Sequence, residues 1–477
     1  MRADLRVLSD AERAEVHERT LRVLVSVGMR VDTELGRRLL AAAGAEVDDE
    51  SRRVRFPPVL VEESLRRAPK DFALGARRPE WRATMNSGEA TLVMSGEATH
   101  VVDGESGALR PGTHDDWLQA TRLIDAIDEI GVYWATVEGT PPGTPPLAGW
   151  VDYNVELQGA FSKHVQDSWL EPAWSPWVLE VLDVVFGRDE VRRRHPYSFL
   201  LTPVSPLVID RPCTESWLAL RGWDIPVAVL PMPMMGTTSP ASLIATTLLA
   251  NCETLGTLCL VQAAEPGTPF IAAALPVAMH PRSGRYASNT FHPMLSAACT
   301  EMARFYGLPV MGSGSGTDAL GGAQAAYEKA LGSLVGSLAR PDLLVGPGSL
   351  GGALVFDPRQ VLIDVEMFRM SRHASRGVAV DDGLWLDDVL GRVGPGGSFL
   401  GERSTRTATR DGEWYLPQLG WHDGIEAWQA AGRPTLEDEC RERVAALLAA
   451  HEPLPLPDDV THELEALRRR ALEEDGM

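Results

Sequence analysis

The sequence predicts an α/β protein built on a parallel (β/α)8 TIM barrel, with a helical and β extension before it and a helical extension after it. Three observations support this fold class. From about residue 130 to residue 350, short apolar runs alternate with longer helical stretches. The runs are almost continuously apolar, which is typical of parallel strands covered on both faces. The chain has 477 residues, more than a single compact core usually holds, so additions to the barrel are expected.

The first 128 residues are expected to form helices and a β region packed on the barrel. Ser9 and Glu12 have the spacing of a capping box, and Thr33 can cap a second helix that ends at Gly44. A third helix is expected to begin at Pro57-Pro58. The stretch 91–110 alternates apolar runs with turn signals, as a hairpin would. Thr113 and Asp116 then cap a further helix.

The barrel core is expected to span residues 129–390. Seven strands are predicted, and the 90–102 region can supply an eighth; the seven lie at 132–139, 163–167, 197–206, 226–236, 269–277, 309–316 and 342–348. An open doubly wound sheet is the alternative architecture. Between the strands, Ser239-Pro240 is expected to begin one helix, and another is expected from Pro293 to Tyr306.

Residues 391–477 are expected to form a separate extension. Its first part is rich in turns and aromatic residues, and two helices follow at 436–450 and 458–474. We expect this extension to pack on the barrel as a lid or as a surface for a partner.

Composition and charge exclude several classes of function. The net charge is −21, whereas nucleic acids and anionic membranes attract clustered Lys and Arg. No uncharged apolar run of membrane-spanning length occurs, the nearest being 243–250, and the charged N-terminus lacks a secretory signal. The five cysteines form no C-x-x-C pair, so buried reduced thiols are expected, without a structural zinc site. These features predict a cytoplasmic protein.

The predicted site lies at the carboxyl ends of the barrel strands, where TIM barrels carry their reactive groups. We assign Asp318 and Glu138 to catalysis. The predicted substrate-binding residues follow other strands or lie on the next helix: Gln166, Thr202, Arg282, Thr317, Gln324, Ser349 and Phe356. Asp318 has an alternative role as the cap of the helix 320–338. Asn251 and Glu253 lie in an apolar helix, where a polar side chain needs a partner. They are expected either to be buried structural partners or to be part of the site.

Other catalytic motifs are absent from the sequence. The segment GSGSGTD (312–318) is rich in glycine but lacks the ending of a Walker loop, so its glycines are expected to let backbone approach a ligand closely. There is no G-x-S-x-G elbow, no S-x-x-K and no H-E-x-x-H. Common serine and zinc hydrolase mechanisms are therefore not supported, and no metal site is expected.

The sequence resembles the trimethylamine methyltransferase superfamily, and in particular its non-pyrrolysine, glycine betaine methyltransferase-like branch. The resemblance covers residues 10–470 and is carried by ARFYGLPVMGSGSGTD (303–318), QAAYEKAL (324–331), DLLVGPGSLGGAL (342–354), GGSFLG (396–401) and EW (413–414). It implies a TIM barrel that transfers a methyl group from a methylated amine to the cobalt of a separate corrinoid protein. It also implies that the enzyme holds no organic cofactor tightly, the cobalamin being carried by the partner.

The chain contains only standard residues, whereas the trimethylamine enzymes use pyrrolysine, so a quaternary amine such as a betaine is the expected substrate. Aromatic faces suited to the cation are Trp134, Phe356 or Trp385, and Arg282 suits a carboxylate. Three segments depart from the family pattern: His280-Pro281-Arg282-Ser283-Gly284, Asn289-Thr290-Phe291-His292 and Ser404. Because of these departures, two alternative functions stay open. One is a barrel lyase or hydrolase that acts without a corrinoid, and the other is a non-catalytic protein that binds quaternary amines.

A homo-oligomer is also expected. The helices around 240–260 and 320–338 are unusually apolar, and apolar surface of this kind is often buried between subunits.

Overall fold

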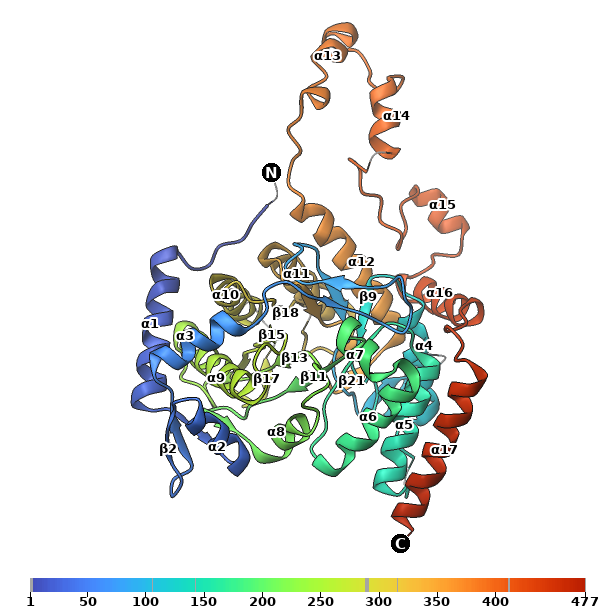
Figure 1. The fold of residues 1–477 in the computed structure, drawn as a ribbon. Helices are drawn as coiled ribbons and strands as arrows, with labels where there is room; N and C mark the ends of the chain where they lie inside the picture. The colour runs from blue at the N-terminus through green and yellow to red at the C-terminus, as the bar shows by residue number, and fades with distance from the viewer. Residues whose placement is uncertain are drawn as a thin grey trace.

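The computed structural model describes residues 3–104, 106–141, 143–287, 291–314, 316–410 and 412–476. Its centre is an eight-stranded parallel sheet in the order β15-β13-β11-β10-β9-β6-β19-β18, and a parallel bridge between Ala272 and Val310 joins the two edge strands. The predicted (β/α)8 barrel is therefore confirmed (Figure 1). The strands are β6 (Thr91–Val93), β9 (Ile130–Tyr133), β10 (His164–Asp167), β11 (Tyr197–Leu201), β13 (Val227–Val229), β15 (Phe270–Ala272), β18 (Met311–Ser313) and β19 (Leu343–Val345).

The eighth strand comes from the segment before residue 129. β6 pairs in parallel with β19 on one side and with β9 on the other. The barrel therefore begins about 40 residues before the expected boundary, and the 90–102 region supplies the strand that the sequence left open. Every residue of β9, β11, β13, β15, β18 and β19 is buried, in agreement with the continuous apolar runs.

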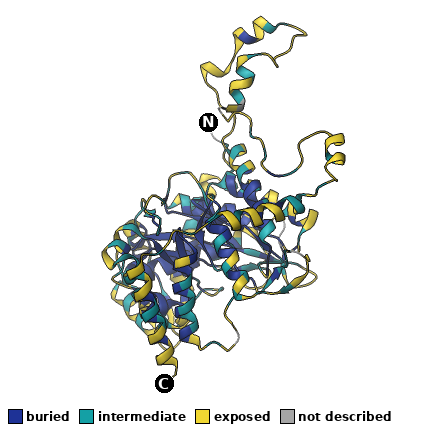
Figure 2. Ribbon diagram, turned by 90° about the vertical axis from the view of Figure 1, so that its right-hand side faces the viewer, coloured by how far each residue is buried: buried dark blue, intermediate teal, exposed yellow. Residues whose placement is uncertain are grey.

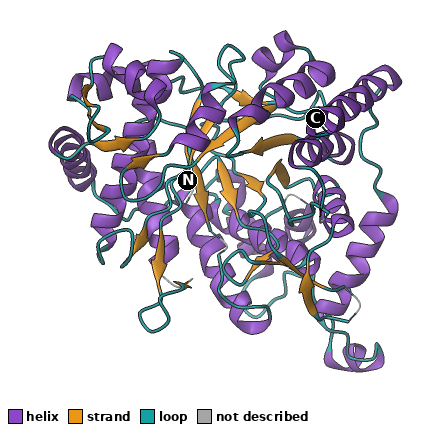
Figure 3. Ribbon diagram, turned by 90° about the horizontal axis from the view of Figure 1, so that it is seen from below, coloured by secondary structure: helices purple, strands orange, loops and turns teal. Residues whose placement is uncertain are grey.

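Helices surround the strands, as the view from below shows (Figure 3). They are α4 (His114–Asp125), α5 (Pro146–Ala160), η1 (Pro172–Trp174), α6 (Ser175–Phe186), α7 (Arg188–Arg194), α8 (Arg211–Leu218), α9 (Leu243–Ala264), α10 (Phe291–Phe305), α11 (Gly322–Ala339) and α12 (Pro358–Ser375). Within the described residues, α9 alone is long and apolar enough to cross a membrane, but 78% of its most apolar window is buried inside the protein. Burial within one chain accounts for this composition, so the apolar sequence of α9 does not by itself require a subunit interface.

The N-terminal helices cover the outer side of α9. They are α1 (Asp10–Ser26), α2 (Glu34–Ala42) and α3 (Pro58–Arg67), and each packs against α9. The capping box of Ser9 and Glu12 and the Thr33 cap are present as predicted. A small sheet between these helices contains β1 (Met29–Val31), β2 (Glu46–Asp48), β3 (Arg53–Arg55) and β12 (Val208–Ile209).

Short sheets extend the loops that follow the barrel strands. One contains β20 (Ser349–Leu350), β21 (Val355–Phe356), β7 (His100–Val102) and β8 (Leu109–Pro111). Another contains β14 (Met234–Met235), β16 (Val277–Met279) and β17 (Tyr286–Ala287), and β4 (Ala73–Leu74) pairs with β5 (Ala83–Thr84). The first two add walls at the carboxyl ends of the barrel strands, where the site was predicted.

Three predicted helix starts are wrong. α9 begins after the cap Ser242, because the Ser239 hydroxyl bonds Thr246 Oγ1 at 2.9 Å instead of capping the backbone. The N-cap of α11 is Gly321, so Asp318 does not cap that helix. α10 starts at Phe291, two residues before Pro293.

The C-terminal extension has two parts with different surroundings. Residues 376–414 form an arm that projects from the body and contains η2 (Asp382–Leu384), α13 (Asp387–Val393) and α14 (Arg403–Arg410); Figure 2 shows it as mostly exposed. α15 (Ile425–Ala430), α16 (Leu436–Ala450) and α17 (Asp458–Asp475) follow. α16 packs on α12 and α4, and α17 packs on α5 and α6. Only these last helices lie on the barrel as expected.

The five cysteines are free and buried, including Cys440, which confirms the interpretation of their pattern. The part of the chain that the structure describes contains no group of three or more His, Cys, Asp or Glu side chains suited to a metal ion.

Candidate active site at the barrel mouth

A cluster of carboxylates lies where the loops after β6, β9 and β10 meet. The segments 97–98 and 136–138 run side by side, because Ala98 N donates to Thr136 O at 3.1 Å and Glu138 N donates to Ala98 O at 2.9 Å. This pairing makes Glu97 and Glu138 neighbours. Asp167 ends β10, the strand next to β9. These three acidic residues form the acidic cluster of the barrel mouth.

Burial and neighbouring charge raise the pKa of two carboxylates in the acidic cluster, Glu97 and Asp167. Desolvation raises the pKa of Glu97, and the charge of Glu138 raises it further. Desolvation also raises the pKa of Asp167, to about 7, with an additional contribution from Glu97. The hydroxyl of Tyr153 donates to Asp167 Oδ2 at 2.9 Å and opposes part of this shift. A bound cation would favour the ionised forms of Glu97 and Asp167.

A hydrogen-bond chain inside the barrel fixes the ring of Trp134, which lies beside the segment that carries Glu97: a Cβ on Gly96 would be 4.0 Å from Trp134 Cε3. Trp134 Nε1 donates to Gln166 Oε1 at 2.7 Å, and Gln166 Nε2 donates to Ser198 Oγ at 2.9 Å. Ser198 Oγ lies 2.8 Å from His164 Nε2, and His164 Nδ1 lies 2.9 Å from the carbonyl oxygen of Gly75. Burial lowers the pKa of His164 to about 3, so the ring is neutral. Since a carbonyl only accepts, Nδ1 carries the proton and Ser198 donates to Nε2.

Gln166 is fully buried, and its amide oxygen and nitrogen are both engaged in this chain. Its position holds the Trp134 indole, which is 8% exposed, in one orientation at the end of β9. The structure thus links a predicted substrate-binding residue to a predicted aromatic face.

Beyond β6 in the strand order, next to β19 and β18, Glu328 of α11 joins two other predicted residues. Thr317 Oγ1 donates to Glu328 Oε2, and Gln324 Nε2 donates to Glu328 Oε1 at 3.0 Å. The carbonyl of Thr317 accepts a hydrogen bond from Gly352 N at 2.8 Å. Thr317 is buried and Gln324 is exposed, so this network ties the loop after β18 to α11 and to the loop after β19.

Tyr286 and His292 form a pair beneath the same loop. The tyrosine hydroxyl lies 2.9 Å from His292 Nδ1, and burial lowers the pKa of His292 to about 4. A Cβ on Gly316 would lie 2.3 Å from the Tyr286 hydroxyl and 2.8 Å from His292 Cε1. Gly314 similarly approaches the carbonyl of Gly332 on α11. These glycines of the 312–318 segment therefore permit close packing within the protein, where the sequence predicted close approach to a ligand.

The other predicted site residues lie in differing surroundings. Ser349 and Phe356 are buried and face each other across β20 and β21. Thr202 is half-buried, with its hydroxyl 3.7 Å from Cys213 Sγ. Arg282 and Asp318 are exposed, and within the described ranges neither side chain makes a hydrogen bond or an ion pair. Asn289 and Thr290 lie outside the described residues, and Ser404 lies on α14 of the arm.

The buried polar residues of α9 are structural. Glu253 accepts hydrogen bonds from Ser205 Oγ and Leu207 N, each at 2.8 Å, and burial raises its pKa to about 7. Asn251 donates to Thr20 Oγ1 at 2.8 Å and to the Tyr306 hydroxyl at 2.9 Å.

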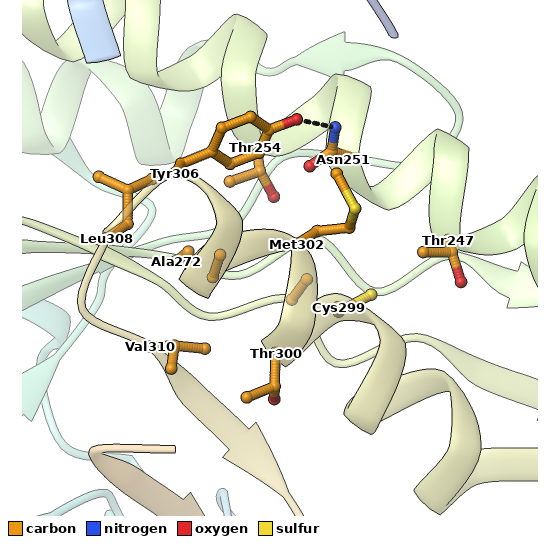
Figure 4. Close-up of a pocket in the computed structure, with 12 residues that line it drawn as sticks. Thr247, Asn251, Thr254, Ala272, Cys299, Thr300, Met302, Tyr306, Leu308 and Val310 are labelled. Carbon is orange, nitrogen blue, oxygen red and sulfur yellow. Dashed lines mark hydrogen bonds between the residues drawn. The ribbon is translucent and has the colours of Figure 1, made fainter. Parts of the chain in front are cut away.

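The second of these bonds crosses a narrow pocket between α9 and α10 (Figure 4). The pocket holds only about 10 Å³, and its lining includes Thr247, Thr254, Cys299 and Met302. That volume is about what one water molecule needs, so this pocket is too small for a substrate.

Sequence reasoning did not assign Glu97, Asp167 or Tyr153 to the site. Glu97 follows the eighth strand, so the same strand-end rule finds it once 91–93 is recognised as a barrel strand. Asp167 adjoins Gln166 at the end of the same strand, but only Gln166 was assigned to the site. Tyr153 lies on α5, and no local signal marks it.

Comparison with known proteins agrees with the fold and with the sequence resemblance. The family model of trimethylamine methyltransferase (MTTB) matches residues 2–474. The trimethylamine methyltransferase MttB of Desulfitobacterium hafniense strain DCB-2 is 28% identical over 474 residues, covering 98% of this chain and 94% of the relative. The glycine betaine methyltransferase of D. hafniense strain Y51 is 25% identical over 473 residues, covering 96% of each.

Among solved structures, the monomethylamine methyltransferase MtmB of Methanosarcina barkeri matches with a TM-score of 0.51. The sequence identity is 12%, and the match covers 98% of this chain and 92% of that one. At this identity the likeness concerns the fold. Because the family model matches nearly the whole length of the sequence, this chain belongs to the trimethylamine methyltransferase (MTTB) family of enzymes.

Proposed function

We propose that this methyltransferase moves a methyl group from a quaternary or otherwise methylated amine, of the betaine type, to the cobalt of a corrinoid carried by a separate protein. The relatives named for trimethylamine and for glycine betaine support a methylated amine as donor. The 477 residues are all standard, so the chain has no pyrrolysine. A donor that carries a permanent positive charge fits this chain better than free trimethylamine.

The acidic cluster carries the proposal. Glu97, Glu138 and Asp167 follow three neighbouring strands, Gly96 beside Glu97 approaches Trp134, and burial together with the charge of another carboxylate raises the pKa of Glu97 and of Asp167. A quaternary ammonium cannot donate a hydrogen bond, so it is held by charge and by aromatic faces. The cluster offers both within one part of the mouth.

Each residue then has a simple task. The carboxylates hold the cation, Trp134 presents its ring, and Gln166 with Ser198 and His164 keeps that ring in place. The partner's cobalt supplies the nucleophile: the methyl carbon bonds to cobalt, and the carbon–nitrogen electron pair stays on nitrogen. Because the leaving amine is neutral, no general acid is required. Catalysis rests on positioning and on exclusion of water.

Other predicted residues keep proposed roles in this scheme. Asp318 and Arg282 are exposed on loops after barrel strands, where they can meet the outer end of the substrate or the corrinoid protein. Thr202 is proposed as a further contact on the loop after β11. Ser349, Phe356, Thr317 and Gln324 are proposed to shape the wall formed by the loops after β18 and β19. The buried, free cysteines support the proposed cytoplasmic location.

The experiment mixes the full-length protein with cob(I)alamin and a panel of methylated amines, and records the methylcobalamin spectrum. Formation with a quaternary amine, and little with dimethylamine, is the expected result. Calorimetric binding without methyl transfer, beside an active control enzyme, would favour the non-catalytic binding protein. Absence of both binding and transfer would favour a barrel lyase or hydrolase.

A further inference from the structure

The arm, residues 376–414, is a loop of about 40 residues with both ends attached to the barrel. It leaves from the end of α12 and returns where Tyr415 and Gln418 bond to Glu366. Gln418 also accepts a hydrogen bond from Arg369 Nη1 at 2.8 Å. Its two limbs are joined by an ion pair of 2.8 Å between Arg392 and Glu402. The arm is therefore an organised projection with a fixed base (Figures 1 and 2).

Many large apolar side chains of the arm are exposed to solvent. Its nine large exposed apolar residues include some of the most exposed in the described chain: Val378, Val380, Leu384, Trp385, Leu386, Leu390, Phe399, Leu400 and Trp414. Leu400 is 85% exposed and Trp385 is 61% exposed. An apolar surface of this extent marks a protein–protein contact.

The position of the arm argues against the methyl acceptor as its partner. Arg372 and Arg376, at the base of the arm, line a cavity together with Glu89 and Pro341, which precede β6 and β19. The arm therefore starts at the amino ends of the barrel strands. The acidic cluster lies at the carboxyl ends, so a protein that delivers a corrinoid to the mouth docks at the other end of the barrel.

The charges of the arm are complementary to those of a second arm. The outgoing limb carries Asp381, Asp382, Asp387 and Asp388, all of them exposed. The returning limb carries Arg403, Arg406 and Arg410, spaced along one face of α14. None of these three arginines forms an ion pair with another described residue. In a two-fold dimer each surface meets its own copy, so antiparallel arms place the acidic limb of one against the basic limb of the other.

We propose that the arm is a dimerisation element whose occupant is the arm of a second copy of this chain. The Trp385, Leu390, Phe399 and Leu400 side chains form the apolar centre of the contact, and the charged limbs fix its antiparallel orientation. Most of the described residues of the arm are exposed, and a stable interface uses about 20–30 residues a side.

The test measures the mass of the full-length protein by light scattering at micromolar concentration. Wild type is expected at twice 51.8 kDa, and the variant W385D/L400D at 51.8 kDa. Both positions are exposed, so the fold of the monomer is retained, as its circular dichroism checks. The matched control is V59D on α3, a residue 79% exposed on the body, which is expected to remain dimeric.

Charge reversal tests the antiparallel orientation. D387R/D388R makes both limbs basic and R403D/R406D makes both acidic, so each variant alone is expected to dissociate at least tenfold more readily. An equimolar mixture of the two is expected to form a heterodimer. A monomeric wild type, or a dimer insensitive to W385D/L400D, overturns the proposal. A monomeric wild type that binds its corrinoid protein through Trp385 and Leu400 overturns it too and assigns the arm to that protein.

Discussion

Lys329 of α11 and Asp364 of α12 form a fully buried ion pair, with Nζ 2.9 Å from Oδ2. The same carboxylate oxygen accepts a hydrogen bond from Gly348 N at 2.8 Å, and Lys329 Nζ donates to the carbonyl of Gly346 at 3.2 Å. The second carboxylate oxygen accepts from Gln360 Nε2 at 2.8 Å. The pair therefore joins two barrel helices to the loop after β19, which leads into one wall of the mouth.

Removal of one partner is expected to destabilise the protein strongly. Lys329→Ala leaves a buried carboxylate without its cation, and the expected loss is about 3–5 kcal/mol in the free energy of unfolding. Chemical denaturation measures this loss. The double variant Lys329→Met/Asp364→Leu should recover most of it, because no charge then remains buried. A single variant as stable as wild type would show that the pair does not hold the helices together.

Glu253 makes stability depend on pH. Its pKa in the folded protein is about 7, raised by burial from the ordinary value of 4.5. The folded state therefore keeps a proton that the unfolded state releases. The free energy of unfolding contributed by this group falls as the pH rises from about 4.5 to about 7, by about 3 kcal/mol, and is constant above that range.

Glu253→Gln removes this pH dependence while keeping the size of the side chain. Melting temperatures of wild type and variant between pH 5 and pH 8 measure the effect. Parallel curves for the two proteins would contradict the assignment.

The affinity for a quaternary ammonium is expected to rise with pH. Asp167 has a pKa of about 7 in the free protein, so it is largely protonated at pH 6 and ionised at pH 8. A cation stabilises the ionised form and is bound more tightly by it. Titration followed by tryptophan fluorescence should show this rise, and Asp167→Asn should remove it. Equal affinities for wild type at pH 6 and pH 8 would separate Asp167 from the cation site.

Gly316→Ala is expected to disturb the mouth. The added Cβ would meet the Tyr286 hydroxyl and the His292 ring at distances shorter than real carbon contacts allow. Such overpacking costs about 1–3 kcal/mol, and displacement of the loop that carries Thr317 should lower kcat/KM. Gly159→Ala on α5 is the matched control, since nothing lies within 4 Å of its Cβ position. Unchanged stability and kinetics in Gly316→Ala would show that the loop yields without cost.

The fold could be predicted largely from local sequence signals. The caps at Ser9, Thr33 and Thr113 are confirmed because each depends on a side chain and a backbone amide three residues away. Ser239 failed as a cap because a long-range partner decides its role: Thr246 takes its hydroxyl in the folded chain. The apolar sequence of α9 could not tell burial within one chain from burial between chains, because both leave the same pattern.

The candidate site was only partly predictable for a related reason. Strand ends gave Glu138, Gln166 and Thr317, which the structure places at the mouth. Glu97 was missed because strand 91–93 was grouped with the following hairpin, and the parallel pairing of this strand with β9 and β19 appears only in the closed barrel. The link between Gln166 and Trp134 likewise depends on two strands being neighbours, which no single segment shows.

The measurement that tests the central claim most directly is the single-turnover rate of methylcobalamin formation from a quaternary amine by wild type and by Glu97→Gln/Glu138→Gln. Both substitutions keep side-chain size and remove charge from the acidic cluster. The account predicts a loss in kcat/KM of at least tenfold, or about 1.4 kcal/mol of transition-state stabilisation, with an unchanged melting temperature. A double variant that transfers the methyl group as fast as wild type would contradict the assignment of the cation site to this cluster.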